Sequence, residues 1–127
     1  FELNKELALH NAPKAVKIAS YIGSAPKFAM PMAVSVIFNQ FSKVLRYGAL
    51  LKRSPHPSPE DKARALAGVN PYFYRDYDTA VRFYPVEKCM KVISLLNEYD
   101  YKGKGGDGGD LDQGTLLVEL VTKILNL

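Results

Sequence analysis

Hydrophobic residues recur every three or four positions along most of this chain, which is the spacing of one face of an α-helix. The longest such stretch runs from Met32 to Leu51 and predicts a helix that is apolar over much of its circumference. A helix of that kind usually lies inside a bundle. The sequence contains no long alternation of β-branched and polar residues that would indicate strands. The pattern therefore predicts an all-α helical bundle with the 32–51 helix near its centre.

Prolines and capping residues mark where the other helices are expected to begin. Ser58 and Asn70 each precede a proline, and both residue types accept hydrogen bonds from the free N–H groups of a helix's first turn. Asn11 or Ala12 is expected to play the same part before Pro13. The flanking helices are expected at 14–22, 59–67, 72–83, 86–101 and 116–125, with a further short one at 2–10.

The helical spacing also predicts which residues of the shorter helices face the core. In the 59–67 helix these are Ala63, Leu66 and Ala67, and Gly68 is expected to end that helix. In the 86–101 helix the expected inner face includes Met90. Each of these helices is thus expected to cover one side of the bundle.

Length and composition fit one ordinary folded domain. The chain has 127 residues, of which 47% are hydrophobic and 24% charged, so we expect residues 1–127 to form a single helical domain. It begins at Phe1 rather than Met, from which we expect it to be a fragment of a longer protein. No stretch reaches the ~20 apolar residues of a membrane span, and the start lacks signal-peptide features. We therefore expect no membrane contact and a cytoplasmic location.

The residues that carry chemistry are too few and too scattered to predict an active site. Cys89 is the only cysteine, and His10 and His56 are the only histidines, so no metal-ligand cluster can be assembled from the spacing. The glycine-rich segment 103–109 lacks the order of a phosphate-binding loop, because no Ser or Thr follows its lysine. Asp76 and Asp78 lie two apart on a helix and point apart. We expect no enzymatic activity and no cofactor for this domain.

Charge is distributed unevenly and leaves a nucleic-acid interpretation open. Residues 1–91 carry 14 basic and 7 acidic side chains, whereas residues 92–127 carry 3 and 6. The segment 59–83 resembles a helix-turn-helix pair whose second helix would direct Arg75 and Arg82 toward DNA. Acidic residues on that helix would repel phosphates. Two helices packed within the bundle, with a mixed solvated surface, explain the same pattern.

Tyrosines are concentrated in one third of the chain, and five of them are candidate interface residues. Tyrosine combines a large apolar ring with a polar hydroxyl and is enriched where proteins bind one another. Positions at the edge of a helical bundle explain the same enrichment equally well. The candidate interface residues are Tyr72, Tyr74, Tyr77, Tyr99 and Tyr101.

Four stretches, taken in order, resemble one known family over nearly the whole chain. They are Asn-Ala-Pro-Lys-Ala-Val-Lys-Ile at 11–18, Ile-Phe-Asn-Gln-Phe-Ser-Lys-Val-Leu at 37–45, Gly-Val-Asn-Pro-Tyr-Phe at 68–73, and Tyr-Asp-Tyr-Lys-Gly at 99–103. With the leucine-rich terminal helix, they are similar to the C-terminal domain of the delta subunit of the bacterial DNA polymerase III clamp loader. The 68–73 and 99–103 stretches look most like the Bacteroidetes branch. The glycine-rich insert before the last helix departs from the family pattern.

The resemblance implies a structural part in DNA replication. Delta subunits carry two preceding AAA+-like domains, which open the sliding clamp, and these would lie outside this chain. The C-terminal domain of the family is a helical, AAA+-associated collar domain that joins delta to the gamma/tau and delta-prime subunits. It serves oligomerisation and not ATP hydrolysis. The sliding clamp and DNA would be contacted by the other parts of the subunit within the DNA polymerase holoenzyme.

The two interpretations of the chain differ in a measurable way. An assembly domain is expected to bind duplex DNA weakly or not at all. A helix-turn-helix module is expected to bind it in a salt-dependent manner, and the Arg75→Ala/Arg82→Ala double variant would abolish that binding. Fluorescence-anisotropy titrations of duplex DNA at low and high salt distinguish the two. Tight binding that the double variant removes would contradict the assembly interpretation.

Overall fold

The computed structural model describes residues 2–106 and 112–127, and these form helices without a strand. A single 3₁₀ turn, η1 (Pro71–Phe73), comes just before the helix α5 (Tyr74–Phe83). The elements are α1 (Glu2–Ala8), α2 (Ala12–Gly23), α3 (Met30–Arg53), α4 (Pro59–Ala65), η1 (Pro71–Phe73), α5 (Tyr74–Phe83), α6 (Val86–Gly103) and α7 (Gln113–Leu125). The predicted all-α class is confirmed.

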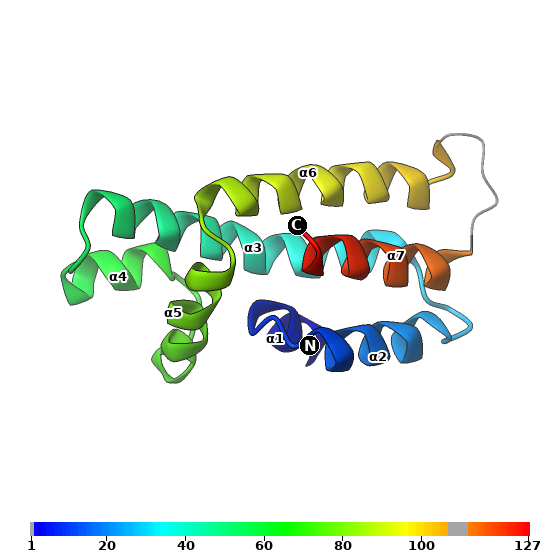
Figure 1. The fold of residues 1–127 in the computed structure, drawn as a ribbon, viewed down its shortest axis with the longest axis horizontal. Helices are drawn as coiled ribbons and strands as arrows, with labels where there is room; N and C mark the ends of the chain where they lie inside the picture. The colour runs from blue at the N-terminus through cyan, green and yellow to red at the C-terminus, as the bar shows by residue number, and fades with distance from the viewer. Residues whose placement is uncertain (1, 107–111) are drawn as a thin grey trace.

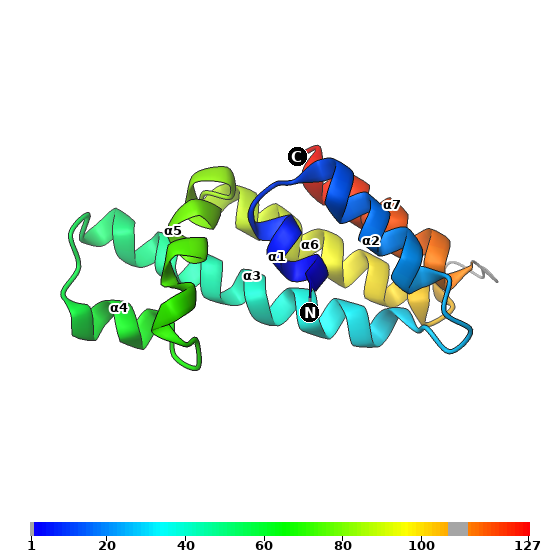
Figure 2. The same ribbon diagram turned by 90° about the horizontal axis from the view of Figure 1, so that it is seen from below.

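The long helix α3 extends through the whole molecule, and the other elements are arranged around it (Figure 1). α6 lies along α3, α7 packs against α6 and α2, and α1 bridges α2, α3 and α5. At the other end α4 folds back beside the last turns of α3, and α5 lies across the direction of α3 (Figures 1 and 2). The expected central position of the 32–51 helix is therefore confirmed.

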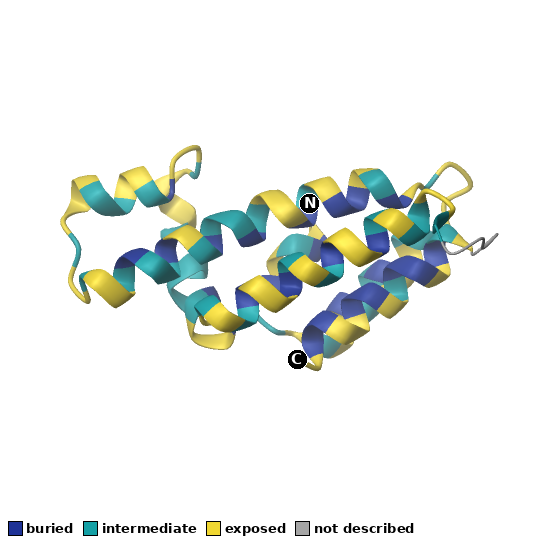
Figure 3. Cartoon of the chain, turned by 90° about the horizontal axis from the view of Figure 1, so that it is seen from above, coloured by how far each residue is buried: buried dark blue, intermediate teal, exposed yellow. Residues whose placement is uncertain are grey.

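The buried apolar residues form two clusters, a large core and a small core. The large core joins the inward faces of α1, α2, α3, α6 and α7, and it includes the fully buried Ile37, Phe41 and Leu120. The small core lies beneath α4 and consists of Tyr47, Leu50 and Leu66. Figure 3 shows that the buried positions of the long helices form stripes, with exposed residues on the opposite faces. α3 contributes buried residues to both cores, and Tyr77 and Val81 of α5 pack against both.

Local capping chemistry explains where several helices begin. The Ser58 hydroxyl accepts a hydrogen bond from the Asp61 N–H at 3.1 Å, and Asn70 Oδ1 accepts one from the Tyr72 N–H at 2.9 Å. Both caps were predicted from the sequence. Asn11 occupies the cap position of α2, but its side chain makes no capping hydrogen bond.

The bounds of α3 and α5 differ from the sequence prediction. α3 starts two residues earlier and ends two residues later than predicted, and Pro31 is accommodated in its first turn, where no N–H donor is needed. The predicted 72–83 helix begins instead with the η1 turn, so regular α5 starts at Tyr74.

The predicted inner faces of two helices were wrong in part. α4 ends at Ala65, and Ala63 and Ala67 are exposed, because α4 lies beside α3 through Lys62, Ala65 and the following Leu66. Met90 is 59% exposed, whereas Cys89 and Val92 of the same helix are buried. Helical spacing predicts an apolar stripe, but the width of the stripe that becomes covered depends on the neighbouring helices.

α2 and α7 approach each other so closely that two glycines meet backbone to backbone. A Cβ placed on Gly23 would lie 2.7 Å from Gly114 Cα, and one placed on Gly114 would lie 2.8 Å from the Gly23 carbonyl carbon. Gly48, inside α3, has more room. The nearest atom to a Cβ placed there would be Val86 Cγ2 at 3.4 Å, which is an ordinary van der Waals distance. The first pair needs glycine for space, and Gly48 does not.

Substitution of these glycines by alanine tests the close approach. We expect Gly114→Ala to lower the free energy of unfolding by about 2 kcal/mol, because rigid backbone must move apart. Gly48→Ala is expected to raise it by up to about 1 kcal/mol, because alanine favours a helix interior over glycine. Thermal unfolding followed by circular dichroism measures both. Equal melting temperatures for the two variants would contradict the predicted contact.

Candidate interaction surface

Two exposed aromatic side chains lie side by side on the turn that leads into α5. Tyr72 is 83% exposed and Phe73 is 48% exposed, and their ring centroids lie 5.2 Å apart in an edge-to-face arrangement. We call residues 70–73 the aromatic turn. Exposed apolar rings are solvated unfavourably, so a pair held together on a surface indicates a contact site for another molecule.

The aromatic turn is held by hydrogen bonds and by proline. Asn70 Oδ1 accepts from the Tyr72 N–H, and the Phe73 N–H donates to the Asn70 carbonyl oxygen at 2.8 Å. Pro71 restricts the backbone between them. Gly68, at φ +87°, lets the chain reverse before the turn. The two rings are therefore presented on a restrained backbone, which lowers the entropy lost on binding.

A groove of about 550 Å³ begins at this turn and continues between α1, α3 and α5. We call it the α1–α5 groove. Lys5 and Lys43 contribute positive charge to its walls, and Glu2 and Asp76 contribute negative charge. The buried carbonyl oxygen of the Asn4 side chain, which lines the groove, has no hydrogen-bond partner among residues 2–106 and 112–127. The lining residues are Glu2, Asn4, Lys5, Ala8, Gln40, Lys43, Gly68, Val69, Asn70, Phe73, Asp76, Tyr77 and Ala80.

Tyr74 and Tyr77 are half-buried and support the surface from beneath. Tyr77 lines the α1–α5 groove and packs against both cores. Burial raises the pKa of its hydroxyl, the Asp76 charge adds to that shift, and the Arg46 charge opposes it. Tyr74 packs on the small core, with Lys62 Nζ 5.5 Å from its ring centroid. Of the candidate interface residues, Tyr72 and Tyr101 are the exposed ones.

A three-residue network fixes α5 against α3 and α4. The Tyr47 hydroxyl donates to Asp78 Oδ1, and Lys62 Nζ lies 3.5 Å from the same carboxylate. Lys62 also lies 5.5 Å from the Tyr47 ring centroid. Desolvation raises the pKa of Tyr47, and its hydrogen bond to Asp78 adds to that shift, so the hydroxyl remains a donor at neutral pH. The sequence pattern contained no signal for this network, because its members come from three separate helices.

Tyr99, a candidate interface residue, is buried within the chain. Its hydroxyl donates to Glu119 Oε1 at 2.6 Å, and Lys102 and Lys123 lie 4.7 and 5.1 Å from its ring centroid. These contacts join α6 to α7. Tyr99 therefore stabilises the bundle, and its buried ring is not accessible to a partner. Tyr101 is 59% exposed near the end of the same helix, far from the aromatic turn.

The candidate DNA contacts Arg75 and Arg82 are both exposed on α5. Residues 66–73 separate α4 from α5, whereas helix-turn-helix motifs join their helices through three or four residues. The geometry therefore departs from that motif. The carboxylate of Asp78 is engaged within the chain, because it contacts Tyr47 and Lys62.

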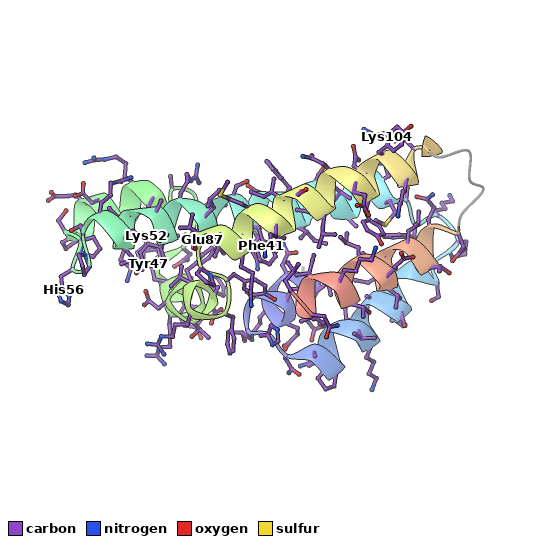
Figure 4. All side chains as sticks on the ribbon, turned by 45° about the horizontal axis from the view of Figure 1, so that its top comes forward. Phe41, Tyr47, Lys52, His56, Glu87 and Lys104 are labelled. Carbon is purple, nitrogen blue, oxygen red and sulfur yellow. The ribbon has the colours of Figure 1, made fainter. Side chains whose placement is uncertain are left out.

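The remaining features singled out in the sequence have structural explanations where they are described. Cys89 is buried, its Sγ donates to the Tyr84 carbonyl oxygen at 3.2 Å, and burial raises its pKa to about 12. Gly103 closes α6, and part of the 103–109 segment lies outside the described residues. Within residues 2–106 and 112–127, no three His, Cys, Asp or Glu side chains are grouped to hold a metal ion. Figure 4 shows Tyr47 near the α4 end and Lys104 at the opposite end.

Comparison with known proteins adds no identification. No family model, no curated protein and no solved structure matches this chain. In the described part of the chain, no helix is both long enough and apolar enough to span a membrane.

The Tyr99–Glu119 contact generates a pH-dependent prediction. The hydrogen bond from Tyr99 lowers the pKa of Glu119, so this contact stabilises the fold above the ordinary carboxyl pKa and its contribution is lost as pH falls. We expect Tyr99→Phe to cost about 1 kcal/mol at neutral pH and to flatten the loss of stability below about pH 5.

Thermal melts of both proteins across the acidic range measure this effect. Tyr101→Phe is the matched control, because it removes a hydroxyl from an exposed ring of the same helix and is expected to change neither the stability nor its pH profile. Parallel pH profiles for the original chain and Tyr99→Phe would contradict the assigned contact.

Proposed function

We propose that this chain is an assembly module that binds partner subunits through the aromatic turn and the α1–α5 groove. The observation that carries the proposal is the exposed Tyr72–Phe73 pair on a restrained turn beside that groove. Aromatic anchors next to a concave surface are typical of binding hot spots. Positively and negatively charged side chains line the groove, and their directional contacts select a partner.

We further propose that the assembly is the clamp loader of DNA polymerase III and that this chain is the collar domain of its delta subunit. The support for this is the resemblance of the four sequence stretches, together with the all-helical bundle that a collar domain requires. Its partners would be the collar domains of gamma/tau and delta-prime. In this role the domain performs no catalysis and holds the loader together while the sliding clamp is loaded.

The positions of the four stretches in the fold separate packing residues from contact residues. The 11–18, 37–45 and 99–103 stretches contribute buried side chains, including Ala15, Phe41 and Tyr99. The 68–73 stretch is different, because both of its aromatic rings are exposed. Three stretches thus contribute to the core, and the 68–73 stretch supplies part of the proposed contact surface.

A double substitution of the aromatic pair tests the proposal. Native mass spectrometry of the chain mixed with gamma/tau and delta-prime collar domains is expected to show a complex with one copy of this chain. Tyr72→Ala/Phe73→Ala is expected to weaken that complex by about thirtyfold, equivalent to about 2 kcal/mol, as loss of a hot spot does. The melting temperature of the double variant is expected to stay close to that of the original chain, since both rings lie outside the cores.

Tyr21→Ala is the matched control, because Tyr21 is 81% exposed on α2 and lies outside the aromatic turn and its groove. It is expected to leave the complex intact. A folded chain that remains monomeric in every mixture would contradict the clamp-loader proposal. A complex that the double variant and Tyr21→Ala weaken equally would contradict the assigned surface and leave the partner assignment standing.

A further inference from the structure

A second concave surface lies at the α4 end of the molecule and contains three of the five arginines in the sequence. It is a cleft of about 470 Å³ between the last turns of α3 and α4, and we call it the arginine cleft. Its lining residues are Arg46, Ala49, Leu50, Arg53, Ser54, Asp61, Arg64 and Ala65.

The arginines surround an apolar floor. Arg46 and Arg53 are seven residues apart and therefore lie on one face of α3, two turns from each other. Arg64 contributes from α4, where its guanidinium lies 3.3 Å from Asp61 Oδ1. Ala49 and Leu50 form the floor between the two helices. Arg46 and Arg53 have no ion-pair partner among the residues that the structure describes.

Packing of α4 does not require these arginines. α4 is held against α3 by the small core, and Lys62 connects it to Asp78 of α5. Arg53 lies in the last turn of α3, where a positive charge complements the helix dipole. Arg64 lies likewise in the last turn of α4 and pairs with Asp61, so the explanation extends to it. It does not extend to Arg46, two turns earlier on α3. The lining therefore contains three arginines against one carboxylate, Asp61, and this excess of positive charge favours a ligand of opposite charge.

We propose that the arginine cleft binds an acidic amphipathic segment of a partner protein. Its carboxylates would pair with Arg46, Arg53 and Arg64, and an apolar side chain would enter against Ala49 and Leu50. Guanidinium groups bind carboxylates through paired, parallel hydrogen bonds, which gives direction as well as attraction. An amphipathic segment in a groove between two helices is a recurring mode of peptide recognition.

The composition of the cleft favours a peptide over a nucleic acid. Proteins that bind single strands combine positive charge with aromatic rings on which bases stack, and no lining residue of the cleft is aromatic. A volume of about 470 Å³ admits a few side chains, so a duplex would contact only the rim. The apolar floor matches a leucine-like side chain better than a sugar-phosphate backbone.

The proposal goes beyond the clamp-loader assignment and does not depend on it. The aromatic turn and the α1–α5 groove share no lining residue with the arginine cleft. The two surfaces approach each other along α3, where the Arg46 charge acts on Tyr77 of the groove. A single partner with an aromatic-binding face and an acidic segment is thus able to engage both.

Fluorescence anisotropy with a defined probe tests the cleft. The probe is a labelled peptide about four turns long in which Glu and Leu recur at helical spacing, and a scrambled peptide of the same composition removes the amphipathic face. Each single variant, Arg46→Gln, Arg53→Gln or Arg64→Gln, is expected to weaken binding about threefold to fivefold. The triple variant is expected to weaken it at least about thirtyfold.

Matched controls separate this site from general charge attraction. Lys17→Gln/Lys27→Gln/Lys91→Gln removes three exposed charges outside the cleft and is expected to weaken binding no more than about twofold. Equal losses for the two triple variants, or equal binding of the scrambled peptide, would overturn the proposal. The proposal would also be overturned if an oligothymidylate bound more tightly than the peptide and lost that binding in the arginine triple variant. Circular dichroism is used to test whether each variant is folded. We expect all of them to fold, because the three arginines are exposed.

Discussion

Burial of α3 on several sides is the constraint on which the rest of the structure depends. Ile37, Phe41 and Val44 lose all contact with solvent, and each such side chain contributes about 1.5–3 kcal/mol when buried. α6 and α7 complete the large core, and α4 folds back to make the small one. Because the same helix continues through both cores, the position of the α4 end is tied to the packing of the main bundle.

The arginine cleft lies at the α4 end, with the aromatic turn close by, and polar contacts hold α3, α4 and α5 together there. Tyr47, Lys62 and Asp78 connect α3, α4 and α5, with Lys62 over two aromatic rings. Such a network has defined geometry because each hydrogen bond has a direction, whereas apolar contacts tolerate sliding. The aromatic turn precedes α5 directly, so the placement of α5 also places Tyr72 and Phe73. The opposite end is held by the Tyr99–Glu119 contact between α6 and α7.

The two surfaces differ in the kind of partner that they suit. The aromatic turn offers apolar area on a restrained backbone, which favours a partner with a complementary pocket. The arginine cleft offers positive charge over an apolar floor, which favours an acidic segment and a salt-dependent association rate. Under the proposal that this chain is an assembly module, the two chemically different surfaces provide two kinds of contact with a partner. This relation between the surfaces is part of the proposal and depends on the partners named above.

The sequence by itself determined the helical class, the central position of α3 and the caps at Ser58 and Asn70, because these depend on local spacing and on hydrogen bonds within a few residues. It also identified Tyr72 as a candidate interface residue, but it did not identify Phe73 beside it. Only the tertiary structure decided that Tyr99 is buried, that Met90 is exposed and that Asp78 bonds to Tyr47. The same holds for the convergence of Arg46, Arg53 and Arg64 on one cleft. Helical periodicity identifies an apolar stripe, but the exposure of a side chain depends on which distant helix covers it, and that is set by packing between residues far apart in the chain.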